Sequence, residues 1–231
     1  MVKNHLKSIT MPKTWQIERK KTVFVTRPNP GAHPMMYSMP LNIVMKELIK
    51  CAKTTKEVKA ILHDKEVLVD GKKRNDEKYS VGLMDVVSLP ETKQNYRIII
   101  NQKGKLKALE IPKEEANIKL SKVENKTVIK KGKIQLNLSD GRNIIVEKDS
   151  YKTGDSLVVA LPTQEIKDTI NFKPGMTALL IGGKHIGFIG KVEDVKSNII
   201  TIKIGENSYE TLKDYAFMVG KDKPIITLDK K

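Results

Sequence analysis

The sequence predicts an α+β protein made of several small domains, with more β-sheet than helix. Its 231 residues exceed the roughly 100–200 residues of a typical domain, so two or three compact units are expected. Apolar residues recur at helical spacing between residues 41 and 63. From residue 96 onward, short β-rich runs alternate with turns that contain glycine. The expected order is a basic arm, a helical module and two β-rich domains.

Residues 1–40 are expected to form an extended basic arm. Prolines interrupt the segment repeatedly, and Lys and Arg greatly outnumber acidic residues. A disordered solubilising tail is one interpretation of such a terminus. However, Trp15 and the run Val23-Phe24-Val25 are costly to leave in water, so we favour a segment that becomes ordered on a large partner surface.

Residues 41–93 are expected to form two short helices, a tight hairpin and a further strand. An apolar stripe runs from Leu41 to Ala52 at steps of three and four residues, which places it on one side of a helix. The second helix can turn Val58 and Leu62 inward in the same way. The opposite faces are predicted to carry Lys46, Lys50 and Lys53 in the first helix and Lys56, Lys59 and His63 in the second.

The hairpin is predicted from the segment VLVDGKKR. Asp70-Gly71 is a dipeptide that two-residue hairpin turns prefer. The turn is expected to present Lys72, Lys73 and Arg74 at the hairpin tip. These residues could be a solvated charged loop, but next to two lysine-rich helix faces we favour a phosphate clamp.

Two β-rich domains are expected in the remainder of the chain. Residues 94–171 contain the runs RIIIN, LKALEI, KIQLNL, NIIVEK and SLVVAL, which predict a central antiparallel β-domain. A short helix is expected to start at Pro112. Residues 172–231 contain four further short β-type runs and predict a small, strongly bent sheet or barrel.

The glycine-rich segment IGGKHIGFIGKV does not fit a nucleotide-binding loop. A phosphate loop requires Ser or Thr after Gly-Lys, whereas Val192 follows Gly190-Lys191. The dinucleotide fingerprint fails because the glycine spacing is wrong and the next segment favours a strand. The segment could simply turn a barrel corner. The basic residues around Gly187, namely Lys184, His185 and Lys191, favour a contact with RNA.

Charge and composition limit the classes of function. A net charge of +16 favours nucleic acid or an anionic membrane as partner. No apolar run of ~18 residues is present, which argues against a membrane, and no signal peptide is recognised, so a cytoplasmic location is expected. Neither a catalytic constellation nor metal-ligand spacing is found, so we predict no enzyme, metal, cofactor or small-molecule substrate. Aromatic residues make up only 5%, which favours folded RNA over single strands.

Several motifs resemble a known family in the same order along the chain. The helix–helix–VLVDGKKR–GLMDVVSL arrangement resembles the S-four RNA-binding domain, and IGGKHIGFIGKVEDV resembles a KOW motif in an SH3-like barrel. The start, with His5, Lys7, Pro12 and Trp15, is similar to the N-terminal signature of the archaeal and eukaryotic small-subunit ribosomal "S-four-e" family. Ser8 departs from this signature, which often has a second basic residue there. The end at Lys231, without a long basic tail, fits an archaeal form.

The resemblance implies a structural constituent of the small ribosomal subunit. Such a protein would bind small-subunit rRNA and neighbouring ribosomal proteins, and would act in the cytoplasm without catalysis. The alternatives are a KOW-type translation or transcription factor that binds RNA transiently, and an RNA-modification guide protein. The candidate RNA-binding residues are His5, Lys7, Lys13, Trp15, Arg19, Lys20, Lys21, Lys46, Lys50, Lys53, Lys56, Lys59, Lys72, Lys73, Arg74, Lys184, His185, Gly187 and Lys191.

Overall fold

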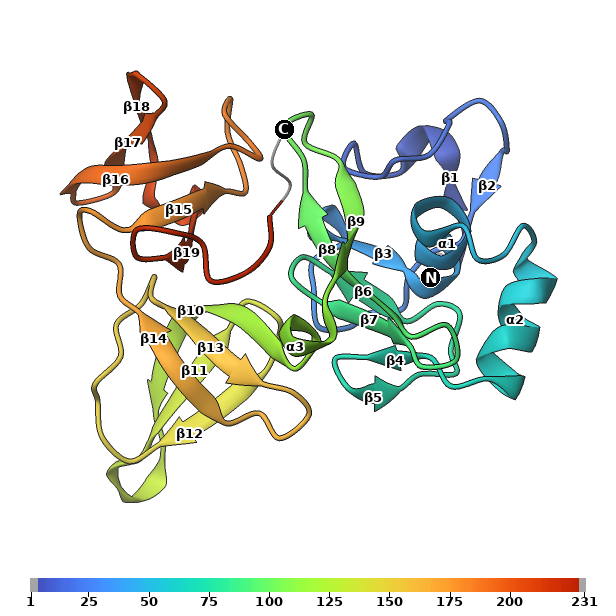
Figure 1. Cartoon of the computed structure of the whole chain (residues 1–231), viewed down its shortest axis with the longest axis horizontal. Coiled ribbons are helices and arrows are strands. Elements are labelled where there is room, and N and C mark those ends of the chain that lie inside the picture. Colours follow the sequence, from blue (N-terminus) through green and yellow to red (C-terminus); the bar gives the residue numbers. More distant parts are fainter. Residues whose placement is uncertain (1–3, 229–231) are drawn as a thin grey trace. The chain divides into compact units, whose positions relative to one another are not determined.

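The computed structural model describes residues 4–228, which fall into two compact units. Unit 1 contains residues 4–99 and 105–117, and unit 2 contains residues 100–104 and 118–228. Antiparallel sheets dominate both units, and the helices are few and short (Figure 1). The α+β class predicted from the sequence is confirmed at this level.

Unit 1 is built on a five-stranded sheet in the order β5-β4-β7-β8-β9. These strands span Lys72–Lys73, Leu68–Val69, Val86–Leu89, Gln94–Ile100 and Leu106–Ile111. A second pair joins β3 (Ser38–Pro40) to β6 (Ser80–Gly82), and a third joins β1 (Leu6–Lys7) to β2 (Phe24–Val25). Strands β8 and β9 fall within residues 94–171, which were predicted to form the central β-domain. In the structure β8 pairs with β7 of unit 1: the residues from Val86 to Leu89 form an antiparallel ladder with those from Gln94 to Arg97.

The first predicted helix is shorter than its apolar stripe suggested. It consists of α1 (Leu41–Ile43) and one π-helical segment (Val44–Ile49), and it ends at Lys50, which has a left-handed φ of 63°. The prediction of a helix continuing to Ala52 is therefore wrong. All residues from Leu41 to Met45 are buried, so the segment is not amphipathic there. Because Lys50 and Lys53 lie beyond the helix, they do not continue a helical face with Lys46.

The second helix, α2 (Thr55–Asp64), agrees with its prediction. Val58 and Leu62 are buried. The Thr54 side chain accepts a hydrogen bond from the Glu57 backbone, and the Glu57 carboxylate accepts one from the Thr54 backbone. This capping box satisfies amide groups that the first helical turn leaves without intrahelical partners.

The N-terminal segment is packed into unit 1, which differs from the expected extended arm. Trp15 is fully buried, and its Nε1 donates a hydrogen bond of 2.8 Å to the Ser38 carbonyl. Met11 is buried in the same apolar core. Burial of the indole, with its N–H paired, removes the cost that suggested an external partner for Trp15.

Unit 2 contains two five-stranded antiparallel sheets. The first has the order β12-β11-β10-β13-β14, with bounds Asn143–Val146, Ile134–Leu138, Ile118–Val128, Ser156–Ala160 and Ile166–Ile170. The second has the order β18-β17-β16-β15-β19, with bounds Asn207–Leu212, Ile199–Ile204, Ile189–Lys196, Thr177–Leu180 and Ala216–Gly220. The strands predicted from the sequence are present, but β10, β14 and β18 were not anticipated.

The long strand β10 organises the first sheet of unit 2. Its first half pairs with β13 and its second half with β11. Lys119 on this strand is 1% exposed in its side chain, and its Nζ lies 3.0 Å from the Asp140 carboxylate. A buried lysine interrupts the apolar alternation that identifies a strand in sequence, which explains why β10 was missed.

Candidate nucleic-acid interface

The β1–β2 ribbon carries the first two candidate residues on its outer face. Lys7 lies directly opposite Phe24 in the ladder, so their side chains share one face. The His5 ring meets the Phe24 ring edge-on, with 5.6 Å between centroids. His5 and Lys7 are both exposed. The other face carries Leu6 and Val25, which pack against the core of unit 1.

The basic residues that follow differ in their surroundings. Lys13, Lys20 and Lys21 are exposed, as a phosphate contact requires. The half-buried guanidinium of Arg19 donates hydrogen bonds to the carbonyls of Ile9 (3.1 Å) and Met11 (3.2 Å). Arg19 therefore ties its own part of the N-terminal segment to the backbone around Ile9 and Met11. Trp15 lies in the interior and offers no surface to a partner.

A groove of about 400 Å³ brings basic residues from distant segments together in unit 1. Lys21 of the N-terminal segment, Lys50 at the helix end and Lys105 before β9 all line it. Glu18 and Glu47 line it as well, so its charge is mixed. The pKa of Lys105 is lowered, first by burial and then by repulsion from Arg19. No sequence signal connected Lys105 with the candidate residues, because only the fold brings it near them.

The outer face of α2 is exposed at Lys56, Lys59 and His63, as predicted. Lys59 Nζ lies 3.4 Å from the Glu77 carboxylate, and His63 Nδ1 lies 2.8 Å from the Asp64 carboxylate. Lys56 is exposed on the same face of α2. Lys53 is exposed before the helix, whereas Lys46 is half-buried.

The predicted hairpin turn is confirmed. Asp70 and Gly71 both have positive φ, at 52° and 72°, and they connect β4 to β5. Lys72 and Lys73 form the exposed strand β5 immediately after the turn. The Arg74 guanidinium instead stacks over the Tyr79 ring at 4.3 Å. Lys72 and Lys73 are thus the exposed cations of this edge, whereas the Arg74 guanidinium makes a cation–π contact with Tyr79 inside unit 1.

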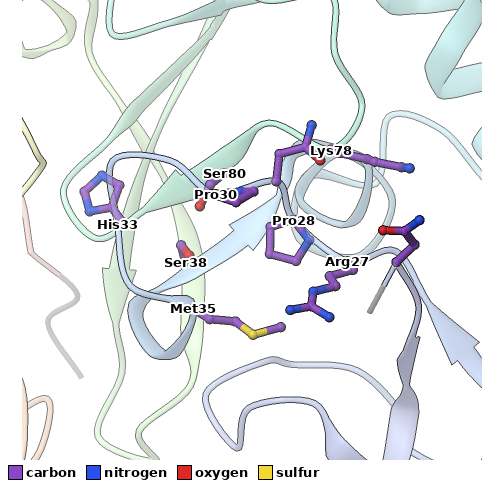
Figure 2. Close-up of a pocket in the computed structure, with 10 residues that line it drawn as sticks. Arg27, Pro28, Pro30, His33, Met35, Ser38, Lys78 and Ser80 are labelled. Carbon is purple, nitrogen blue, oxygen red and sulfur yellow. The ribbon is translucent and has the colours of Figure 1, made fainter. Parts of the chain in front are cut away.

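A pocket of about 340 Å³ in unit 1 has basic and neutral walls. Arg27, His33 and Lys78 line it, and no described acidic residue does. Figure 2 shows Arg27 and Met35 on one side of this pocket and His33 at the opposite end. The His33 ring contacts the buried Asp85 carboxylate at 2.9 Å, which fixes that end. Guanidinium and ammonium donors without a lining carboxylate suit an anion such as a phosphate. Arg27 and Lys78 were not among the sequence candidates.

The glycine loop of unit 2 uses its glycines for internal packing. A Cβ on Gly187, whose φ is +80°, would lie 2.2 Å from the Asn101 carbonyl oxygen. A Cβ on Gly182 would meet the Tyr215 ring, and one on Gly190 would meet Ile202. These glycines are therefore explained by close packing at a corner of the sheet, which is one of the two interpretations given from the sequence.

The side chains around this loop are partly exposed. Lys184 is exposed, and the His185 ring lies 4.1 Å from the Tyr209 ring. Lys191 Nζ lies 2.9 Å from the Asp222 carboxylate, and this hydrogen bond lowers the pKa of Asp222. Lys184 is accordingly the cation of the loop best placed to meet a polyanion.

Two other features, a metal-binding cluster and a membrane-spanning helix, are absent from the described part of the chain. Among residues 4–228, no group of three His, Cys, Asp or Glu side chains is arranged to hold a metal ion. None of the helices found in the same range is long and apolar enough to cross a membrane.

Comparison with known proteins gives consistent matches along the chain. Residues 92–166 match the model described as "Ribosomal family S4e", and residues 2–36 match the RS4NT domain. The crystal structure of 30S ribosomal protein S4e from Thermoplasma acidophilum superimposes with a TM-score of 0.71 at 32% identity, covering 80% of this chain and 96% of that one.

Two curated relatives are similar over nearly their full lengths. "Small ribosomal subunit protein eS4" of Methanococcus vannielii is 42% identical, with 98% of each chain covered. The protein of the same name from Methanocaldococcus jannaschii is 45% identical, again with 98% of each chain covered. The chain therefore belongs to the S4e family of ribosomal proteins.

Proposed function

We propose that the chain is a structural constituent of the small ribosomal subunit that binds folded small-subunit rRNA. The observation that carries this proposal is the similarity, over 98% of the chain, to proteins named as small ribosomal subunit proteins. The net charge of +16 supplies the electrostatic attraction that a polyanionic partner requires. The protein acts in the cytoplasm, within the ribosome, beside other small-subunit proteins, and it catalyses no reaction.

The RNA-binding surface of unit 1 combines three exposed basic elements. They are the outer face of α2, the edge strand β5, and the pocket lined by Arg27 and Lys78. Helix α2 and the β4–β5 hairpin are the parts that resemble an S-four RNA-binding domain. Lysine and arginine on such elements contact phosphates and sugars, which suits recognition of RNA by shape.

Unit 2 contributes a smaller surface around Lys184. The sheet from β15 to β19 acts as the SH3-like barrel with its KOW segment. Register shifts between Val192 and Asp194 and between Thr177 and Ala178 support this assignment, because bulges bend strands sharply enough for a barrel.

The salt dependence of binding to a small-subunit rRNA fragment tests this function. If about six to ten phosphates are neutralised, affinity should fall by about 10³–10⁵-fold between about 50 and 200 mM salt. Filter binding over that range measures the fall. A salt-independent affinity would contradict binding through phosphate contacts.

Sedimentation of ribosomal subunits in high salt separates this function from the alternatives. A structural constituent stays with the small subunit, whereas a translation or transcription factor that visits RNA transiently is released. Mass analysis of rRNA bases after deletion of the protein tests the guide alternative. Loss of a specific base modification would favour that alternative over a structural role.

A further inference from the structure

The β1–β2 ribbon exposes apolar side chains that its own fold leaves uncovered. Phe24 is 57% exposed, and the neighbouring Val23 is 68% exposed. Ile9 is 74% exposed, and the Ser8 N–H preceding it donates to the Val23 carbonyl at 3.0 Å. Clustered exposed apolar groups of this kind mark a surface that a partner covers.

The register of the ribbon determines which side chains face outward. Leu6 pairs with Val25, and both pack against the core of unit 1. Because side chains alternate along a strand, Phe24 and Lys7 must then face away from that core. The pairing of β1 with β2 thus determines that the Phe24 ring points away from the core of unit 1.

The neighbours of Phe24 suit a base rather than an apolar protein surface. The His5 ring stands at 88° to the Phe24 ring, so it supports one edge of that ring. Lys7 lies directly across the ladder and brings a cation to the same face. Further along the segment Lys20 and Lys21 are exposed, with Glu18 as the acidic residue among them. An aromatic ring with a cation on the same face can stack a base while the cation contacts a neighbouring phosphate.

We propose that Phe24, with His5 and Lys7, is a stacking site for one unpaired base of the RNA. This inference rests on the proposed RNA-binding function and adds a base contact to its phosphate contacts. The few aromatic residues of the chain argued against a platform for long single strands. A single ring instead suits one base that is turned out of a folded RNA.

Fluorescence of a Phe24→Trp variant tests the stacking directly. The natural chain has one tryptophan, Trp15, which is fully buried and hydrogen-bonded to Ser38, so it provides a constant background. Addition of a small-subunit rRNA fragment should quench the added emission of Phe24→Trp and leave the wild-type emission unchanged. Binding of the variant without any quenching would overturn the inference.

Affinity measurements with three further variants separate stacking from apolar contact. Phe24→Ala should weaken binding about 5- to 150-fold, the range expected for one stacked base. Phe24→Leu should lose nearly as much, because leucine keeps an apolar surface but has no π-face. Phe24→Tyr should bind nearly as wild type does. If Phe24→Leu keeps full affinity, the ring contacts an apolar protein surface or nothing, and the inference fails.

A matched control excludes a general effect of removing an exposed apolar side chain. Ile145, on β12 of unit 2, is also 57% exposed, and Ile145→Ala should leave RNA affinity and the melting temperature unchanged. If the wild-type protein binds the fragment but Phe24→Ala binds equally well, stacking is refuted and the proposed function stands. If the wild-type protein does not bind, the proposed function and this inference both fail.

Discussion

At the scale of single residues, buried charges in unit 2 are held by specific partners. The Asp140 carboxylate lies 3.0 Å from Lys119 Nζ, accepts a hydrogen bond from Ser121 Oγ at 3.0 Å, and lies 3.3 Å from Arg142 Nε. The side chains of Lys119 and Asp140 are 1% and 2% exposed. A charge at such depth is tolerated only with a partner, so this group constrains the fold strongly.

Replacing Asp140 with Ala should destabilise the protein by about 3–5 kcal/mol, because the Lys119 ammonium loses its carboxylate. Urea unfolding measures this loss. The double variant Lys119→Met with Asp140→Leu should recover most of it, because neither charge of the Lys119–Asp140 pair is then left buried without its partner. A loss below about 1 kcal/mol for Asp140→Ala would show that the pair is not essential.

At the scale of elements, helix α2 depends on its capping box. The pKa of Glu57 is lowered, first by the hydrogen bond from the Lys53 backbone and then by that from the Thr54 hydroxyl. Lys53 N–H lies 2.7 Å from the Glu57 carboxylate. Since α2 carries Lys56 and Lys59, the stability of its first turn also determines how firmly these cations are presented.

Removing the Thr54 hydroxyl, as in Thr54→Ala, should cost about 1 kcal/mol of unfolding free energy. The Glu57 contribution should depend on pH. Its folded-state pKa lies below the unfolded value, so this contribution is present above about 4.5 and is lost as pH falls through the lowered pKa. The stability difference between wild type and Glu57→Ala should therefore shrink on acidification. A difference that grows on acidification would contradict this sign.

The edge strand β5 is the element whose charge is easiest to change without affecting the core. Lys72 and Lys73 are both exposed, and Lys72→Gln with Lys73→Gln should leave the melting temperature unchanged. If each lysine contacts one phosphate, the negative slope of log affinity against log salt should become shallower by about 2. The matched control is Lys196→Gln with Lys203→Gln in unit 2, which should keep the wild-type slope. Equal slopes for all three proteins would exclude β5 from the interface.

At the scale of the whole molecule, the described chain forms two β-rich units, and both have basic surfaces. Charge is distributed over α2, β5, the Arg27 pocket and the Lys184 loop rather than gathered in one cleft. Such a distribution fits a large, folded polyanion that is contacted at many points. The affinity should therefore be spread over many residues, with Phe24 as a proposed point of stronger local contact.

The sequence alone determined the elements whose signals are local. The Asp70-Gly71 turn and the apolar face of α2 were predicted because turn chemistry and helical spacing act over a few residues. The motif order along the chain indicated the family, which the full-length similarity then established. The exposed candidates Lys56, Lys72 and Lys184 followed from the same local patterns.

Only the tertiary structure decided which residues are buried and which distant segments meet. It placed Trp15 in the core and turned Phe24 outward, although both are apolar residues of one basic segment. It also moved β8 and β9 into the sheet of unit 1 and brought Arg27 beside Lys78 in one pocket. The physical reason is that burial and strand pairing depend on contacts between residues far apart in the chain, and periodicity records only neighbours a few positions away.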